Sequence, residues 1–302
     1  MLPAFLTAFF FALNGTCASY SVRALGSVRA NVGRLAVAAV ILGLFAHTVG
    51  NGFASASTGW FLLSGLIGMG IGDLGVYGAL PLLGSRLTVL MTQCLAAPIA
   101  ALGEWWWLGT TLTTTQILWG LLILAGVAVA ISPSKSSPPR VKIKPIGFAL
   151  GLLAAAGQGF GALVSRKGVD VATAAGEVAQ TATFGLNAAY HRILAGFVFA
   201  ALWGLALRAA NRLPPAPTPP APFKKAFGLT VANGLAGPVL GVGCYQWALA
   251  TTPSGLVLPI VATAPLISIP IAYWLENDRP TRRAIIGGVV AVAGCIALTT
   301  LR

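Results

Sequence analysis

The sequence predicts an all-α integral membrane protein with about ten transmembrane helices, arranged as two inverted five-helix repeats. Three observations predict this fold: a very low charge content, a nearly unbroken succession of apolar segments, and a similarity between the two halves of the chain. Of 302 residues, 57% are hydrophobic and only 8% are charged, whereas soluble domains carry about 25% charged residues. Such a chain has too few charged side chains to cover its surface in water, whereas apolar side chains can face the lipid hydrocarbon at no cost.

The apolar segments follow one another from the first residues to the last. The spans that we expect are Leu2–Tyr20, Leu35–Val49, Trp60–Leu83, Leu87–Trp107, Thr115–Ile131, Ile146–Val164, Arg192–Leu207, Phe227–Leu249, Leu256–Leu275 and Ala284–Leu301. The second and the seventh are short for a hydrocarbon core of about 30 Å. No cleavable signal peptide is expected, because no basic residue precedes the first apolar run.

The formal net charge of +13 does not indicate a nucleic-acid partner, because the basic residues lie between the expected spans. With ten spans, fifteen of them fall on one side of the membrane: Arg23, Arg29, Arg34, Arg86, Lys135, Arg140, Lys142, Lys144, Arg208, Arg212, Lys224, Lys225, Arg279, Arg282 and Arg283. Four fall on the other: Arg166, Lys167, Arg192 and Arg302. This bias favours contact with anionic lipid, and the positive-inside rule then places both termini outside the cytoplasm.

Two connections stand out, one by its composition and one by its length. The segment Ser132–Pro139 and the basic residues after it separate the halves, so we expect a first repeat at 1–133, a linker at 134–144 and a second repeat at 145–302. The connection Ser165–His191 is expected to be long, either as a tolerated insertion with a surface helix or as a substrate lid.

Residues of the two halves match in the same order. The matched pairs are Thr113 with Thr281, Gly120 with Gly288, Gly126 with Gly294, Asn14 with Gln158, Ser21 with Ser165, and Arg34 with Arg192. Each half contains an odd number of expected spans, so the second half has to be inverted relative to the first. Inverted repeats with a site at their interface are typical of secondary transporters.

A short pattern also recurs in each half. Pro98 precedes Leu108–Thr113 and Gln116, and Pro265 precedes Asp278–Thr281, with spaced glycines after each. With this pattern each half resembles an EamA-type half of the drug/metabolite transporter superfamily, although Thr110 stands where the family usually has Glu. The resemblance implies ten helices as five plus five, export of a small metabolite or drug, and a place in the inner membrane of a bacterial cell. It also implies cytoplasmic termini, which conflicts with the charge bias.

Polar residues inside the spans are the candidate site, because they are costly in lipid and face the interior of a bundle. Asp73 is the only carboxylate expected near the middle of a span, where it could exchange a proton or neutralise a cationic substrate group. The alternative is a structural Asp bonded to a carbonyl or to an arginine such as Arg86. The expected substrate and proton pathway consists of Asp73, Tyr77, Asn14, Gln158, Gln93, Tyr245 and Gln246.

Asn14 and Gln158 occupy matched positions, which suggests a symmetric pair across the interface. Each of these polar residues alone more often bonds helices together than contacts substrate, and only as a set do they indicate a site. Pro98, Pro259 and Pro265 interrupt expected helices and are candidate hinges, with rigid kinks as the alternative. Four Gly-x-x-x-Gly pairs predict close helix contacts: Gly68 with Gly72, Gly147 with Gly151, Gly157 with Gly161, and Gly237 with Gly241.

No enzymatic activity is expected. The segment Gly70–Asp73 matches the GxGD motif of intramembrane aspartyl proteases, but that chemistry needs a second carboxylate, and the other five acids fall in loops or at the ends of expected spans. The four cysteines lack metal-ligand spacing, so neither a metal nor a cofactor is expected. The expected partners are a small-molecule substrate and the lipid bilayer, with a homodimer left open. Proton-coupled multidrug efflux, and a membrane sensor or scaffold that moves no solute, remain alternative functions.

Overall fold

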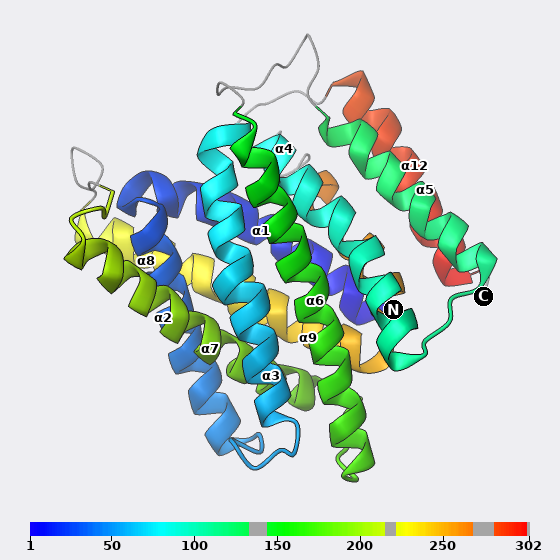
Figure 1. The fold of residues 1–302 in the computed structure, drawn as a ribbon, viewed down its shortest axis with the longest axis horizontal. Helices are drawn as coiled ribbons and strands as arrows, with labels where there is room; N and C mark the ends of the chain where they lie inside the picture. The colour runs from blue at the N-terminus through cyan, green and yellow to red at the C-terminus, as the bar shows by residue number, and fades with distance from the viewer. Residues whose placement is uncertain (133–143, 215–221, 268–280, 301–302) are drawn as a thin grey trace.

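Apolar helices dominate the computed structural model, which describes residues 1–132, 144–214, 222–267 and 281–300 (Figure 1). Every regular element in these ranges is a helix. In the first half they are α1 (Leu2–Leu25), α2 (Ser27–Thr48), α3 (Thr58–Gly65), η1 (Leu66–Ile71), α4 (Gly72–Gly103), η2 (Glu104–Leu108) and α5 (Thr114–Ile131). In the second half they are α6 (Ile146–Ala174), α7 (Ala182–Ala209), α8 (Phe223–Gly234), η3 (Leu235–Gly241), α9 (Val242–Thr251), α10 (Ser254–Val261) and α12 (Arg282–Thr300). The elements η1, η2 and η3 are π-helical turns.

Six helical runs of the described chain are long and apolar enough to cross a membrane: Leu2–Val22, Ser27–Thr48, Thr58–Val76, Ile146–Ala174, Ala182–Ala209 and Phe223–Thr251. They cover the first, second, third, sixth, seventh and eighth expected spans. Thr114–Ala130 and Ser254–Ile267 are shorter apolar helices at the fifth and ninth. The all-helical membrane architecture is therefore confirmed, while the count of ten spans stays a prediction.

Matched threonines begin the last helix of each half. Thr113 accepts a hydrogen bond from the backbone N–H of Gln116, whose side chain accepts one in return from the Thr113 N–H. This capping box satisfies N–H groups that the first helical turn would otherwise leave unpaired. Thr281 likewise accepts a hydrogen bond from the Ala284 N–H ahead of α12. The repeated Thr therefore caps the start of a helix in both halves.

The long connection expected at Ser165–His191 is wrong. Helix α6 continues to Ala174 and α7 begins at Ala182, because residues of this segment bury apolar surface. Val169, Ala172 and Phe184 pack with Phe61 in one buried cluster, and the Thr181 side chain caps α7 through the Phe184 N–H. The seventh span is consequently not short, and neither is the second, since α2 begins at Ser27.

The contacts of α6 show that α4 folds back on itself. A Cβ on Gly157 would lie 2.5 Å from the Cα of Gly72, and one on Gly159 would lie 2.8 Å from Cγ2 of Ile99. Residues 72 and 99 would be about 40 Å apart in a straight helix (27 residues at 1.5 Å), yet they contact positions of α6 only two residues apart. Residues on the two sides of the reversal therefore form two arms, as expected for the third and fourth spans.

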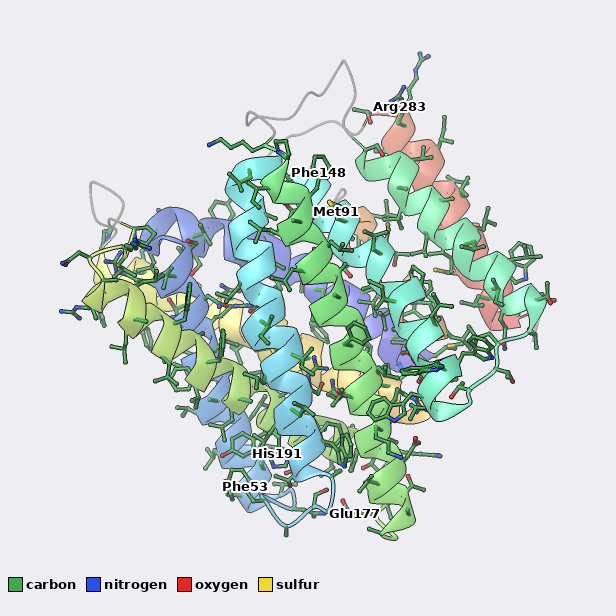
Figure 2. All side chains as sticks on the ribbon, viewed as in Figure 1. Phe53, Met91, Phe148, Glu177, His191 and Arg283 are labelled. Carbon is green, nitrogen blue, oxygen red and sulfur yellow. The ribbon has the colours of Figure 1, made fainter. Side chains whose placement is uncertain are left out.

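Helices that match between the halves lie antiparallel. In the α2–α7 pair, Gly43 faces Tyr190 and Gly204 faces Val28. In the α5–α12 pair, which Figure 1 shows side by side at one flank, Gly126 faces Ala291 while Gly294 faces Ile123. Figure 2 places Phe53, His191 and Glu177 at one end of the bundle and Phe148 at the other. We call these the Phe53 end and the Phe148 end.

Candidate functional site

Asp73 lies in the first turn of α4, directly after the π-helical turn η1, and forms an ion pair with Arg34 of α2. The Arg34 Nη2 donates to Asp73 Oδ2 at 2.9 Å, and the two side chains are only 11% and 18% exposed. Arg34 also donates through Nε to Asn31 Oδ1 at 2.8 Å, and Asn31 is a further hydrogen-bond partner of Asp73. Asn31 and Arg34 share a helix face because they are three residues apart. The result is a closed polar triad between two helices.

The triad corrects two expectations. The structural alternative for Asp73 named Arg86, whereas the arginine that pairs with it is Arg34. Arg34 was also expected between two spans, and Arg192 at the very start of the seventh span, but both are buried inside helices. Without these two and without Arg166, which lies inside α6 in an ion pair, the expected division is fourteen basic residues against two, so the predicted bias keeps its direction.

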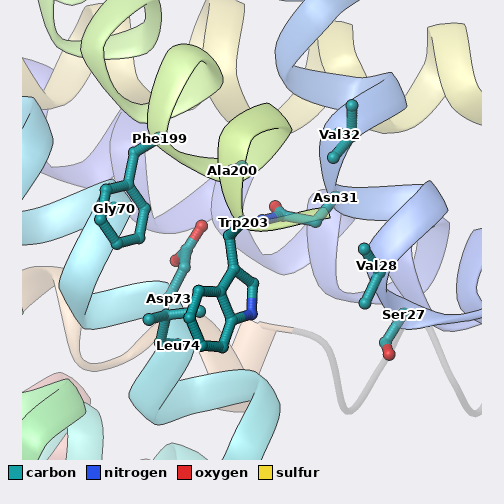
Figure 3. Close-up of a pocket in the computed structure, with 10 residues that line it drawn as sticks. All are labelled: Ser27, Val28, Asn31, Val32, Gly70, Asp73, Leu74, Phe199, Ala200 and Trp203. Carbon is teal, nitrogen blue, oxygen red and sulfur yellow. The ribbon is translucent and has the colours of Figure 1, made fainter. Parts of the chain in front are cut away.

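A pocket of about 400 Å³, including its open mouth, adjoins the triad. It is lined by Ser27, Val28, Asn31, Val32, Gly70, Asp73, Leu74, Phe199, Ala200 and Trp203. Figure 3 shows Asp73 and Asn31 reaching toward each other from α4 and α2, with the rings of Phe199 and Trp203 of α7 beside them. An acid, an amide and two aromatic rings are a combination that suits a small polar molecule with an apolar part.

Arg192 of α7, the match of Arg34 in the second half, is 2% exposed. Its Nη1 donates to Ser165 Oγ of α6 at 3.2 Å, and its guanidinium lies 5.6 Å from the centroid of the Tyr245 ring of α9. Gly68 and Gly161 leave room beside it, since Cβ atoms there would come within 2.8 and 3.4 Å of Nη2. Arg192 therefore occupies the contact region between η1 of the first half and helices of the second.

The other expected pathway residues come from several helices. Tyr245 and Gln246 are both buried on α9, and neither the Tyr245 hydroxyl nor the Gln246 amide has a hydrogen-bond partner within the described ranges. Asn14 of α1 packs against Gly237 of η3. Gln93 and Gln158 are half-buried on α4 and α6, and their roles, like the pairing of Asn14 with Gln158, stay predictions. Tyr77 belongs to α4, but its side chain lies outside the described ones.

The proline positions differ from one another. Pro98 is exposed within the unbroken helical arm that ends α4, so it produces no helix break there. Pro259 lies inside α10, which ends at Val261. A turn at Ala262 and Thr263 follows, before the helical segment that contains Pro265. The ninth expected span is therefore interrupted between these two prolines, while their action as hinges stays a prediction.

A second buried ion pair was missed by sequence reasoning, which placed both of its residues at helix ends. Glu104 is 1% exposed and accepts from Arg166 Nε and from the Ser254 N–H, each at 2.8 Å. Arg166 in turn donates to the Leu249 carbonyl. The pair thus holds together the end of α4, the middle of α6 and the α9–α10 corner. One feature of the sequence could have suggested this pair: the count of expected spans places the acid Glu104 and the base Arg166 on the same side of the membrane.

No cluster of three or more His, Cys, Asp or Glu side chains that could hold a metal occurs among the described residues. The four cysteines lie in four different helices.

Comparison with known proteins gives three findings. The family model described as the EamA-like transporter family matches residues 1–132 and 145–300. No curated protein matches the chain. Among solved structures, one described as a crystal structure of a protein superposes with a TM-score of 0.71 at 18% sequence identity, covering 99% of this chain and 96% of the other. At that identity the likeness concerns the fold alone.

Proposed function

Because this chain belongs to the EamA-like transporter family, a family of membrane transporters, we propose that it is a secondary transporter that moves a small metabolite or drug by alternating access. Its apolar helices and its family indicate an integral membrane protein. We propose the inner membrane of a bacterial cell as its location and export as its direction, both by analogy with the family.

The observation that carries the mechanism is a pair of helix crossings between the halves: in each, a π-helical turn of one half packs on the first helix of the other half. The η1 turn of the first half packs on α6 of the second half, with Gly68 against Gly161 and Gly72 against Gly157. The η3 turn of the second half packs on α1 of the first half, with Gly237 against Asn14 and Gly241 against Phe11. Gly68 and Gly72 fall on Gly237 and Gly241 at one offset of 169 residues. The glycines of the two crossings are therefore equivalent by sequence, and each pair packs against the first helix of the opposite half.

Such crossings suit a rocking motion. At the first crossing, glycine backbones meet without intervening side chains, and at the second the glycines face the side chains of Asn14 and Phe11. The absence of glycine side chains lets the helices approach closely at both places. The π-helical turns at both crossings depart from regular helix geometry, which is common at functional sites. Together with the antiparallel pairs α2–α7 and α5–α12, this arrangement supports two inverted repeats that move against each other around a central site.

The two ion pairs supply candidate gates. Arg34 and Asp73 lie in the half of the bundle toward the Phe148 end, since α2 begins there; Glu104 and Arg166 lie toward the Phe53 end, where α4 and η2 finish. In an alternating-access cycle one gate opens while the other stays closed. Proton uptake by Asp73 would release Arg34 and is the proposed coupling step, a scheme that also fits proton-coupled multidrug efflux.

The proposal is tested in two stages with purified protein. A thermal-shift screen against amino acids, nucleobases and cationic drugs identifies a ligand class, because a ligand that binds the folded state raises apparent stability. Counterflow of the radiolabelled ligand is then measured in proteoliposomes, with protein-free liposomes as control. Saturable counterflow is the expected result. Saturable binding without counterflow would support a sensor instead, and silence across all classes would favour a scaffold.

A further inference from the structure

Arg192 carries a buried positive charge that forms no direct ion pair with a carboxylate of the described residues. Asp73 pairs with Arg34 and Glu104 pairs with Arg166, and these are the two ion pairs of the described structure. Of the remaining described acids, Asp170 is exposed, and Glu177 accepts hydrogen bonds from Ser55 and Ala56 in the loop after α2. The interaction of Arg192 with Ser165 is with a neutral hydroxyl.

The internal repeat shows what is missing beside Arg192. The offset of 169 that superposes Gly68 and Gly72 on Gly237 and Gly241 places Asp73 on Val242, a buried residue at the start of α9. The backbones are equivalent as well, since Gly65 packs against the Arg192 backbone and Gly234 against that of Arg34. Both halves therefore present an arginine at the same kind of crossing, but only the first half supplies an acid for it.

An uncompensated guanidinium inside a membrane protein is expensive and marks ligand pathways. The Nε donor of Arg192 has no hydrogen-bond partner among the described atoms. The hydroxyl of Tyr245, whose ring lies under the Arg192 guanidinium, has none either. The planar fork of an arginine matches the two oxygens of a carboxylate or a phosphate. With the Arg34–Asp73 pair neutral overall, the interface holds one net positive charge.

We propose that Arg192, with the Tyr245 hydroxyl as a second donor, binds an oxyanion group, carboxylate or phosphate, of the transported molecule. Toward Arg192 the anion has the role that the Asp73 carboxylate has toward Arg34 in the other half. This inference rests on the proposed transport function and deepens it by naming an anionic substrate class.

The test measures binding to purified protein with four probes of one shape: benzoate, phenyl phosphate, neutral benzamide and cationic benzylamine, titrated at constant ionic strength. We expect a saturable rise in melting temperature with benzoate or phenyl phosphate and none with the other two. Benzoate alone would assign the site to carboxylates, and phenyl phosphate alone to phosphates. No shift with any probe, or an equal shift with benzamide or benzylamine, would overturn the proposal.

Three variants locate the effect. Arg192→Met removes the charge, and Val242→Asp restores the acid that the repeat lacks; each should weaken anion binding at least about tenfold, as expected for a lost charged hydrogen bond. Arg208→Met removes one exposed positive charge from the same helix and should leave binding unchanged. Because Val242→Asp could disturb folding, Arg192→Met decides the outcome: unchanged anion binding by this variant contradicts the assignment.

The two proposals fail separately. Anion binding that depends on Arg192, without counterflow in proteoliposomes, would uphold the anion site and refute transport. Counterflow of a neutral or cationic solute that is insensitive to Arg192→Met would uphold transport and refute the anion site.

Discussion

Arg34 Nη2 lies 2.9 Å from Asp73 Oδ2 inside the bundle, and this contact joins α2 to the first arm of α4. Asn31 closes the triad by accepting from Arg34 Nε. Because neither charged group can be rehydrated readily in this setting, the loss of one partner should cost more than the loss of both.

Arg34→Met is expected to destabilise the protein by about 3–5 kcal/mol, because it leaves Asp73 buried without its cation. Asp73→Asn should cost less, since Arg34 keeps its bond to Asn31. The double variant Arg34→Met/Asp73→Asn should be more stable than Arg34→Met alone. Denaturant unfolding in detergent micelles measures all three; additive losses in the double variant would contradict a coupled pair.

Glu104→Ala is expected to cost about as much, because it removes the partner of Arg166 and leaves the Ser254 N–H uncapped. Asp170→Asn is the matched control, since Asp170 is an exposed acid on α6 and such surface substitutions change stability by about 0.5 kcal/mol or less. The same unfolding measurement applies. Equal stability of the two variants would mean that the Glu104 contacts contribute nothing.

Gly157→Ala tests the crossing between η1 and α6. The added Cβ would lie 2.5 Å from the Gly72 Cα, a backbone atom that cannot move aside, so we expect a loss of about 1–3 kcal/mol from overpacking. Gly288→Ala on α12 is the control, because a Cβ there meets nothing within 4 Å and Ala favours a helix by about 0.5–1 kcal/mol over Gly. A Gly157→Ala protein as stable as wild type would exclude a tight crossing.

The sequence predicted features that depend on composition and local pattern. Apolar segments identified the helices, and the Gly-x-x-x-Gly pairs identified the crossings, because both reflect periodicity along one chain. It did not predict which charges pair. Arg34 and Arg192 were recognised as matched, yet Arg34 was placed just before a short span and Arg192 at the first position of one, so neither was expected inside a helix. Only tertiary packing, through Asp73 and the apolar contacts of Phe61 and Phe184, shows that the helices continue past them.

Sidedness is predicted from the two ends of the bundle. Single cysteines at Phe53 and Val178 should react with a membrane-impermeant reagent from one side, and cysteines at Lys144 and Phe223 from the other. All four positions are exposed, and α6 connects the two ends. The background replaces Cys17, Cys94, Cys244 and Cys295 with Ala. The positive-inside rule places Lys144 and Phe223 in the cytoplasm; labelling of these two from outside the cell would reverse the orientation in favour of the family pattern.

Asp73→Asn tests the proposed coupling to protons. The charged and polar groups that face Asp73 are Arg34 and Asn31 from α2 and, at longer range, Arg192 from α7. Because Asn can neither bind nor release a proton, the variant should lose accumulation driven by a pH gradient, while counterflow, which needs no net proton movement, continues. A size-exclusion profile like that of the wild type shows that the variant is folded. Arg34→Met is the second control, because it keeps the titrating acid but loses stability, and so shows what lost stability alone does to accumulation. Gradient-driven accumulation at the wild-type level by Asp73→Asn would assign Asp73 a structural role in the triad and place proton coupling, if present, elsewhere in the chain.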